Sequence, residues 1–116
     1  EELSAIKNLI VTHQASAYKS LGIVCKTESQ ACEMAEKLQI PDIHFLSNQS
    51  SAFVQGIVIT SAHMAKGLEF DEVIIPQVDD KNYHSEIDRS MLYVAVTRAM
   101  HRLTLTYSGT KHTPFI

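Results

Sequence analysis

The sequence predicts an α/β domain built on a largely parallel sheet, with helices packed against it. Short apolar runs typical of buried strands alternate along the chain with segments whose apolar residues recur at helical spacing. Most of the strand candidates are apolar throughout, as expected when both faces of a parallel sheet are covered. The length of 116 residues and the apolar content of 45% suit one globular domain with a real core. We therefore treat residues 1–116 as a single domain.

The first predicted elements are a helix and a short strand. Apolar residues recur at helical spacing from Leu3 to about Tyr18, and residues 22–25 form an apolar run typical of a buried strand. The two cysteines, Cys25 and Cys32, fall on predicted strand and helix positions. We expect both to be small buried hydrophobic residues in a reducing cytoplasm, with a disulfide as the alternative.

A second helix and a second strand follow. The segment 30–39 carries its apolar residues on one helical face, and either Thr27 or Ser29 can cap its N-terminus. Pro41 stops this helix, because proline lacks the N–H that a helix interior requires. Residues 43–46 then form the second predicted strand.

The second half of the chain continues the alternation. Residues 57–61 and 72–76 are the third and fourth predicted strands, and residues 103–107 are the last. Between them, Ser85 can cap a helix that we expect to run to about Met100.

A charged segment directly follows the third predicted strand. It carries His63, Lys66, Gly67 and Glu69, and Gly67 permits a close backbone approach that a Cβ would forbid. Because ligands of parallel sheets bind beyond the carboxyl ends of the strands, the segment is a candidate binding loop. The alternative is a surface turn whose Lys66–Glu69 ion pair contributes well under about 1 kcal/mol. A Lys-Gly pair without a preceding GxxxxG is not a phosphate loop, so the segment would not hold a nucleotide alone.

A second cluster of interest spans residues 91–99. Its six consecutive apolar residues, Met91 to Val96, would face every side of a helix, so we expect this helix to be wedged within the fold. A buried strand is the competing interpretation. As a helix, the cluster places Arg98 near the C-terminal end, where a cation complements the helix dipole by about 0.3–1 kcal/mol.

These two clusters resemble motifs V and VI of the UvrD/Rep-like superfamily 1 helicases. The matching stretches are TSAHMAKGLEFDEVIIPQV and DRSMLYVAVTRAMHRLTLTYS, and within them AKGLEF and YVAVTRA are each distinctive. They occur in the family's order and cover the second half of the chain, whereas the first half matches only in its strand–helix rhythm. The resemblance implies the second RecA-like motor domain (2A) of an ATP-dependent DNA helicase or translocase, with a layered P-loop NTPase-type fold.

The resemblance implies roles for four residues at an ATP site between two RecA-like domains. Arg98 matches the arginine finger that reaches the γ-phosphate, a role that suits the permanently charged, forked guanidinium. Glu69 matches a glutamate beside the ribose. Gly67 would let the backbone approach the nucleotide, and Lys66 would support it through its charge.

Two further residues match positions on the nucleic-acid side of such helicases. His63 matches a histidine that faces single-stranded DNA, where stacking or a phosphate contact would bind the strand. A histidine packed at a strand end is the alternative. Ser61 stands where the family often has threonine, and its hydroxyl preserves the polar contact. The segment would thus join a DNA surface to an ATP surface.

The resemblance also implies cofactors and partners. The cofactor would be ATP with Mg²⁺, the metal being held by the first motor domain, so the isolated chain is expected not to hydrolyse ATP. The partners would be single-stranded DNA, on which the motor moves 3′ to 5′, and the N-terminal RecA-like domain of the same polypeptide. Between Leu46 and Ile57 there are only about ten residues, too few for the domain that many relatives insert there. This resembles the compact helicase IV-like branch, which makes RNA polymerase a further candidate partner.

Composition excludes some classes of protein and leaves others open. The net charge of −3 is not that of a polycation, so any nucleic-acid contact must use a local patch. No apolar run approaches the roughly 18 residues of a membrane span, and a cytoplasmic location is expected. The histidines and cysteines lack metal-site spacing, so no metal ligands are predicted. The alternatives to a motor domain are a non-catalytic RecA-like module that docks a partner protein or nucleic acid, and part of a DNA-repair nuclease–helicase fusion.

Overall fold

The computed structural model describes residues 2–39, 43–45, 56–65, 69–79 and 82–107. Its elements are α1 (Glu2–Gln14), β1 (Ser20–Cys25), α2 (Glu28–Leu38), β2 (Ile43–Phe45), β3 (Gly56–Ser61), β4 (Phe70–Ile75), α3 (Glu86–Val96) and β5 (Ala99–Leu105). The five strands form a sheet in the order β2-β3-β1-β4-β5, and each of its strand pairings is parallel. The predicted α/β class and the predicted alternation of elements are therefore confirmed.

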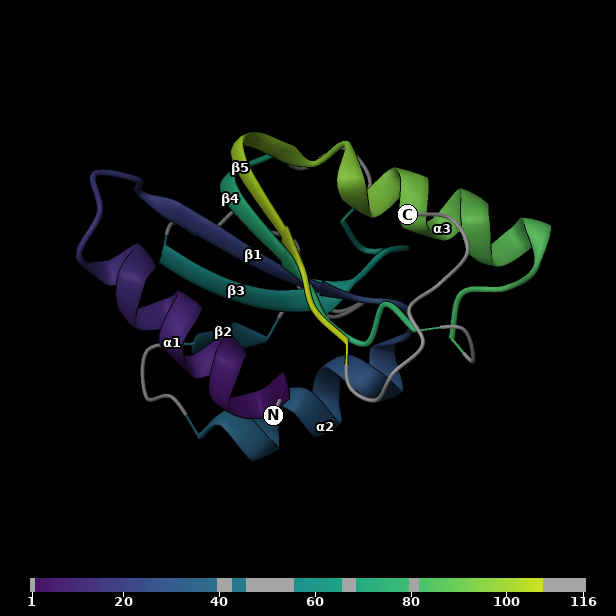
Figure 1. Cartoon of the computed structure of the whole chain (residues 1–116), viewed down its shortest axis with the longest axis horizontal. Helices are drawn as coiled ribbons and strands as arrows, with labels where there is room; N and C mark the ends of the chain where they lie inside the picture. Colours follow the sequence, from purple (N-terminus) through teal and green to yellow (C-terminus); the bar gives the residue numbers. More distant parts are fainter. Residues whose placement is uncertain (1, 40–42, 46–55, 66–68, 80–81, 108–116) are drawn as a thin grey trace.

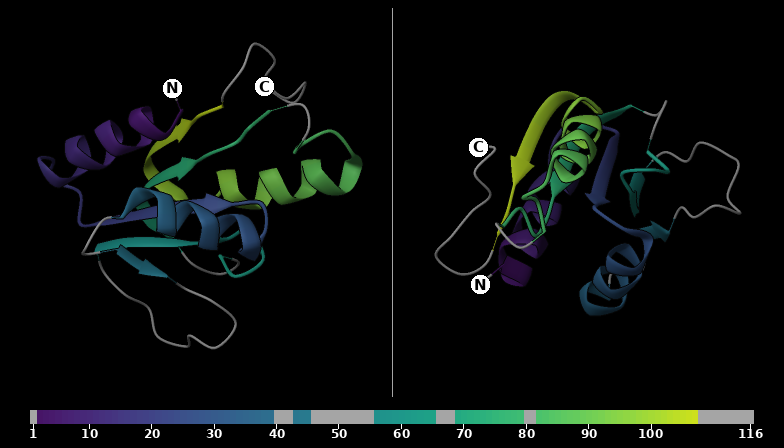
Figure 2. Two further views of the ribbon diagram at one scale, coloured as in Figure 1. Left: turned by 90° about the horizontal axis from the view of Figure 1, so that it is seen from below. Right: turned by 90° about the vertical axis from the view of Figure 1, so that its right-hand side faces the viewer.

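Helices cover both faces of the sheet. Helices α1 and α2 pack on one face and α3 packs on the other, as Figures 1 and 2 show. Because successive residues of a strand point to opposite faces, β1 contributes Ile23 to the core under α1 and α2 and Val24 to the core under α3. This sandwich explains why the central strands are mostly apolar. No helix in the described ranges is long and apolar enough to cross a membrane.

Two helices end earlier than their sequence patterns predict. Helix α1 ends at Gln14 rather than near Tyr18, because the chain turns at Ser16, whose N–H and Oγ both donate to the His13 carbonyl. Helix α3 ends at Val96 rather than near Met100. Pairing with β4 takes over there, since β5 already begins at Ala99.

The predicted helix starts agree with the structure. Thr27, one of the two candidates, caps α2, and its side chain accepts a hydrogen bond from the Gln30 N–H at 3.2 Å. Ser85 caps α3 in a capping box, in which Ser85 and Asp88 each accept from the other's backbone N–H. At the C-terminus of α2, Gln39 adopts a left-handed conformation (φ 51°), and Pro41 lies outside the described residues.

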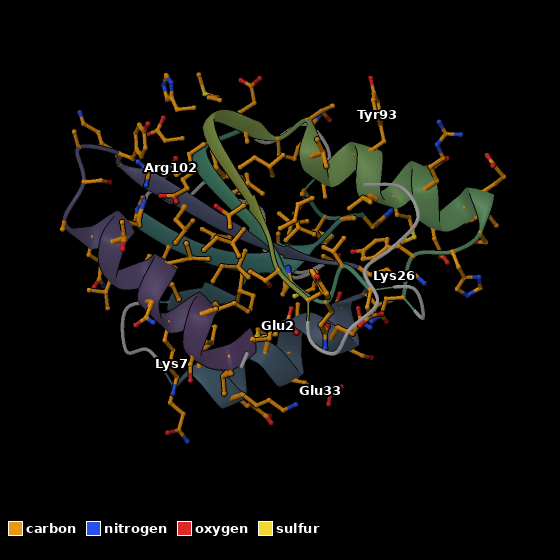
Figure 3. The ribbon with its side chains drawn as sticks, in the orientation of Figure 1. Glu2, Lys7, Lys26, Glu33, Tyr93 and Arg102 are labelled. Atoms are coloured by element: carbon orange, nitrogen blue, oxygen red, sulfur yellow. The ribbon has the colours of Figure 1, made fainter. Side chains whose placement is uncertain are left out.

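Two predictions of burial were wrong. Helix α3 is not wedged within the fold, because Ile87 is 74% exposed and Tyr93 is 69% exposed; Tyr93 projects away from the sheet (Figure 3). Only one side of this helix meets the sheet. Cys25 is buried, and burial raises the pKa of its thiol to about 12, whereas Cys32 is exposed on α2. Both are free cysteines, since they lie on different layers of the fold.

The Phe70 ring packs closely against Gly22, which has no side chain. The Phe70 ring lies over Gly22 of β1, on the face that α3 covers. A Cβ at position 22 would lie 2.5 Å from Phe70 Cδ2, closer than any ordinary contact. Phe70 is buried, so its rigid ring has little room to retreat.

We expect Gly22→Ala to lower the free energy of unfolding by about 1–3 kcal/mol, because the new methyl group overpacks this contact. Urea denaturation of the parent and variant chains measures the change. Combining Gly22→Ala with Phe70→Leu should cost less than the sum of the two single changes, because the smaller side chain relieves the clash. An unfolding free energy of Gly22→Ala within about 0.5 kcal/mol of the parent would contradict the packing argument.

Candidate functional site

The candidate binding segment connects the carboxyl end of β3 to the amino end of β4, at opposite ends of the parallel strands. Its start lies at the carboxyl edge, where Ser61 ends β3 beside Cys25 of β1, and the Ala62 N–H donates to the Cys25 carbonyl at 2.8 Å. Its end lies at the amino edge, where Phe70 begins β4. Strands β3 and β4 flank β1, so the segment crosses from one neighbour of β1 to the other. Residues 66–68, which include Lys66 and Gly67, lie outside the described part of the chain.

The two predicted motifs meet at the amino edge of the sheet. The Phe70 N–H donates to the Arg98 carbonyl at 2.9 Å, and Phe70 pairs with Ala99 in the register of β4 and β5. Glu69, which is exposed, precedes Phe70, and Arg98 precedes Ala99. Glu69 and Arg98, which were predicted to share a nucleotide site, therefore directly precede two neighbouring strands.

The Arg98 guanidinium is held at the C-terminal end of α3. Its Nε donates to the Val94 carbonyl at 3.1 Å, and its Nη2 donates to Thr97 Oγ1 at 3.2 Å. Thr97 Oγ1 itself donates to the same Val94 carbonyl at 2.9 Å. These contacts satisfy carbonyl groups that a helix end leaves unpaired, as the helix-dipole alternative expects. Arg98 is only partly buried, so the contacts do not remove it from the surface.

His63 lies at a pocket on the α3 side of the sheet. The pocket has a volume of about 250 Å³ and is lined by Ala62, His63, Met91 and Val94. His63 is exposed, so it is not the packed histidine of the alternative interpretation. The apolar lining with one imidazole suits a flat, partly apolar group.

Ser61 has a structural role at the start of the same segment. It is 4% exposed, and its Oγ accepts a hydrogen bond from the Met64 N–H at 3.3 Å. This contact stabilises the turn that presents His63. A nucleic-acid contact by Ser61 stays a prediction.

A partly buried ion pair fixes the other end of α3. Lys26 Nζ, directly after β1, lies 2.7 Å from Asp88 Oδ1 and 5.9 Å from the centre of the Tyr83 ring. Lys26 holds the pKa of Asp88 well below its usual range, and the backbone N–H groups of His84 and Ser85 lower that pKa further. The helix that carries Arg98 at its end is thus anchored to the sheet at its start.

Three contributors to the site were not predicted from the sequence. Met91 and Val94 line the pocket, and the Phe70–Arg98 backbone bond joins the two motifs. The sequence signal for Val94 was its place one turn before Arg98, which indicated a shared helix face but no pocket. Within the described ranges, no group of three or more His, Cys, Asp or Glu side chains could hold a metal ion.

The fold and the paired motifs define an α/β domain of the helicase C-terminal type. Residues 56–106 match the family described as UvrD-like helicase C-terminal domain. Two similar proteins are DNA helicase II of Escherichia coli K12, 34% identical over 73 residues, and the Gabija protein GajB of Bacillus cereus VD045, 41% identical over 58 residues. These matches cover 54% and 50% of this chain, but only 10% and 12% of the relatives. The chain thus spans about a tenth of the length of the curated relatives it matches.

Solved structures agree with this assignment. The C-terminal domain of a possible DNA helicase from Lactobacillus strain WCFS1 superposes with a TM-score of 0.83 at 25% identity, over 98% of this chain and 70% of that one. The arterivirus nonstructural protein 10 helicase shares the fold, with a TM-score of 0.51 and 15% identity over 95% of this chain and 28% of that one. The second half of the chain is thus similar to UvrD-like helicase C-terminal domains, and the predicted layered RecA-like fold is confirmed.

We expect the Lys26–Asp88 pair to make stability depend on acid pH. The pKa of Asp88 is lower in the folded chain than in the unfolded chain, so the carboxylate stabilises the fold above about pH 4 and loses this effect as the pH falls further. Asp88→Asn should therefore cost most near neutral pH, and its cost should shrink below about pH 4. Urea denaturation between about pH 2.5 and pH 7 measures the difference.

Glu33→Gln, at an exposed carboxylate on α2, is the matched control and should show no such pH-dependent difference. A cost of Asp88→Asn that stays constant across the range would show that the ion pair does not stabilise the folded chain.

Proposed function

We propose that this domain is the C-terminal motor domain of an ATP-dependent DNA helicase or translocase. The observation that carries the proposal is the 2.9 Å hydrogen bond from the Phe70 N–H to the Arg98 carbonyl. It sets the end of the AKGLEF motif beside the arginine of the YVAVTRA motif, as a shared nucleotide site requires. The similarity to DNA helicase II supports the same function.

In this proposal Arg98 completes an ATP site at the amino edge of the sheet. The guanidinium would leave or share its helix-end carbonyl to bind the γ-phosphate, which its planar fork of donors suits. Glu69, which precedes β4 at the same edge, would accept from the ribose. Gly67 and Lys66 keep their proposed roles beside the nucleotide. ATP supplies the phosphoryl group, and we propose that its Mg²⁺ is held by the first motor domain.

The nucleic-acid side of the proposal rests on the pocket at His63. Its lining by Ala62, Met91 and Val94 suits an unstacked base, and the imidazole can stack or donate. Val94 belongs to both sites, because its side chain lines this pocket and its carbonyl binds Arg98. A movement of Arg98 on ATP binding could thus alter the grip on the strand through one helical turn.

Further parts of the proposal come from the family resemblance. We propose movement 3′ to 5′ on single-stranded DNA, a first RecA-like domain in the same polypeptide as partner, and a cytoplasmic location. RNA polymerase remains a candidate partner, and DNA repair a candidate pathway.

In the complete protein, Arg98→Ala should lower the turnover number of ATP hydrolysis by about 10³-fold or more, the range measured for arginine fingers. The affinity for single-stranded DNA should change little, because Arg98 is not among the described residues that line the pocket at His63. A coupled ATPase assay with saturating single-stranded DNA and a fluorescence binding titration measure the two effects.

Arg89→Ala, which removes an exposed arginine from the same helix, is the control and should keep parental turnover. Near-parental ATPase activity of the Arg98→Ala protein would remove Arg98 from the nucleotide site.

His63→Ala should weaken single-stranded DNA binding by about 5- to 160-fold in the complete protein, the effect expected for a lost stacking contact of about 1–3 kcal/mol. DNA stimulation of ATPase activity should then need more DNA. Titration with a labelled oligonucleotide measures both. Lys7→Ala, on α1 at the opposite face of the sheet, should leave the affinity unchanged. Unchanged affinity in the His63→Ala protein would refute the DNA role of this pocket.

A further inference from the structure

The strand that follows Arg98 contains a bulge. Phe70 pairs with Ala99, but Glu72 pairs with Arg102, so β5 has one more residue than β4 between the two pairs. Regular pairing continues from Leu103 onward. Bulges bend a strand and increase its twist, and they redirect neighbouring side chains beside active sites. The bulge therefore helps to set the direction in which the chain holds Arg98.

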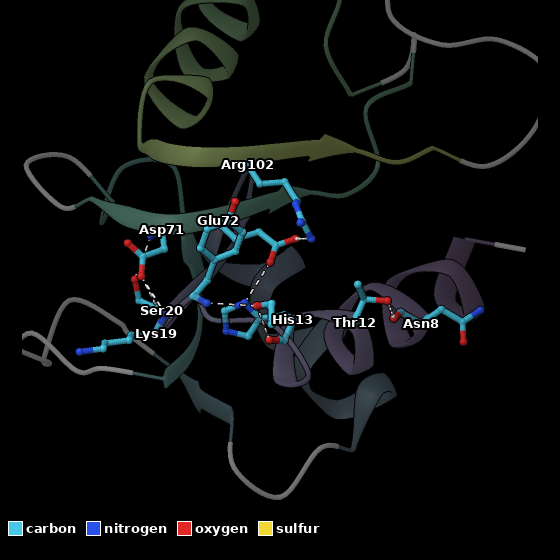
Figure 4. A network of polar contacts seen from close by, with 10 residues as sticks. Asn8, Thr12, His13, Lys19, Ser20, Asp71, Glu72 and Arg102 are labelled. Carbon is cyan, nitrogen blue, oxygen red and sulfur yellow. Dashed lines mark hydrogen bonds and ion pairs between the residues drawn. The ribbon is translucent and has the colours of Figure 1, made fainter.

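A buried carboxylate selects this bulged pairing. Glu72 is 0% exposed; its Oε1 lies 2.9 Å from His13 Nδ1 and its Oε2 lies 3.7 Å from Arg102 Nη1 (Figure 4). Oε2 has no hydrogen bond within the described part of the chain, so Arg102 is the cation that compensates it there. Without the bulge, His101 would stand opposite Glu72 and Arg102 would point to the other face. A buried charge without its partner is costly, which favours the bulge.

Further contacts hold the bulge from outside. The Tyr18 ring stacks on the His101 ring, with centroids 5.5 Å apart and an angle of 3° between planes. The Arg102 guanidinium lies 5.1 Å from the centre of the same Tyr18 ring, and His101 Nε2 lies 3.9 Å from Asp71 Oδ1. Tyr18 lies in the connection between α1 and β1, and Asp71 lies on β4, so segments that precede β5 in the chain hold the bulge.

We propose that Arg102 and Glu72 are a positioning pair for Arg98. By holding the bulge, they orient the first residues of β5. Arg98 directly precedes this strand, and its carbonyl accepts a hydrogen bond from the Phe70 N–H. Neither residue needs to contact ATP, because both act through the backbone between Arg98 and Arg102. The inference rests on the proposed function, since ATP turnover is the property that the orientation of Arg98 changes.

The test is Arg102→Met in the complete helicase, a change that keeps an unbranched, flexible side chain but removes its guanidinium and its charge. We expect the turnover number of DNA-stimulated ATP hydrolysis to fall about tenfold, with the KM for ATP and the Kd for single-stranded DNA within about twofold of the parent. Arg102→Lys restores a cation opposite Glu72 and should recover most of the turnover. Arg89→Ala, an exposed arginine on α3, is the matched control and should change nothing.

A second variant separates positioning from stability. Arg102→Met removes the cation beside Glu72 Oε2 and leaves only the His13 contact at Oε1, so it should also lower the thermal unfolding midpoint. Adding Glu72→Gln removes the charge of the buried carboxylate, so it should restore the thermal unfolding midpoint. It should not restore the turnover number, because the pair that holds the bulge is still missing. Recovery of both by Glu72→Gln would reduce the pair to a structural role and overturn the inference.

A third measurement distinguishes failure of this inference from failure of the proposed function. In an Arg98→Ala background, Arg102→Met should cause no further loss of the residual turnover; a further loss would show that Arg102 acts apart from Arg98 and would overturn the inference. Parental turnover in Arg102→Met, with turnover lost in Arg98→Ala, overturns the positioning pair alone. Parental turnover in Arg98→Ala overturns the proposed function and this inference with it.

Discussion

The arrangement of the domain depends on one backbone hydrogen bond, from the Phe70 N–H to the Arg98 carbonyl. Phe70 is buried, and a buried N–H needs an acceptor. The Arg98 carbonyl is that acceptor, so the first residue of β4 is bonded to the turn that follows α3. Two segments that are distant in sequence thereby become neighbours at the amino edge of the sheet. Without this pairing, Glu69 and Arg98 would not precede neighbouring strands.

Helix α3 links the two proposed binding surfaces because it is anchored at both ends. Its start is fixed by the Ser85 capping box and by the Lys26–Asp88 ion pair, and its end binds Arg98 through the Val94 carbonyl. Its middle lines the His63 pocket. A rigid element that touches both surfaces transmits a displacement from one to the other, whereas a loop would absorb it.

The sheet carries a charge in its interior that the hydrophobic effect alone would exclude. Glu72 lies on β4 and faces His13 of α1 and Arg102 of β5, so three different elements meet at one carboxylate. Apolar replacements of such groups are often neutral or stabilising, so the burial of Glu72 is weak evidence for stability. Its effect on strand pairing is the stronger explanation, because only a directional partner distinguishes the bulged register from the regular one.

Local sequence patterns determined the fold class, the order of the elements and the caps at Thr27 and Ser85, because apolar periodicity and capping chemistry act over a few neighbouring residues. The two motifs were identified by their resemblance to a known family. Tertiary structure decided where α1 and α3 end and which sides of α3 reach solvent. It also decided the pocket at His63 and the bulge at Glu72. Each of these depends on which distant strand or helix lies alongside, and no window of local sequence contains that partner. Cys32 illustrates the limit, since its pattern indicated burial but the sheet meets the other side of its helix.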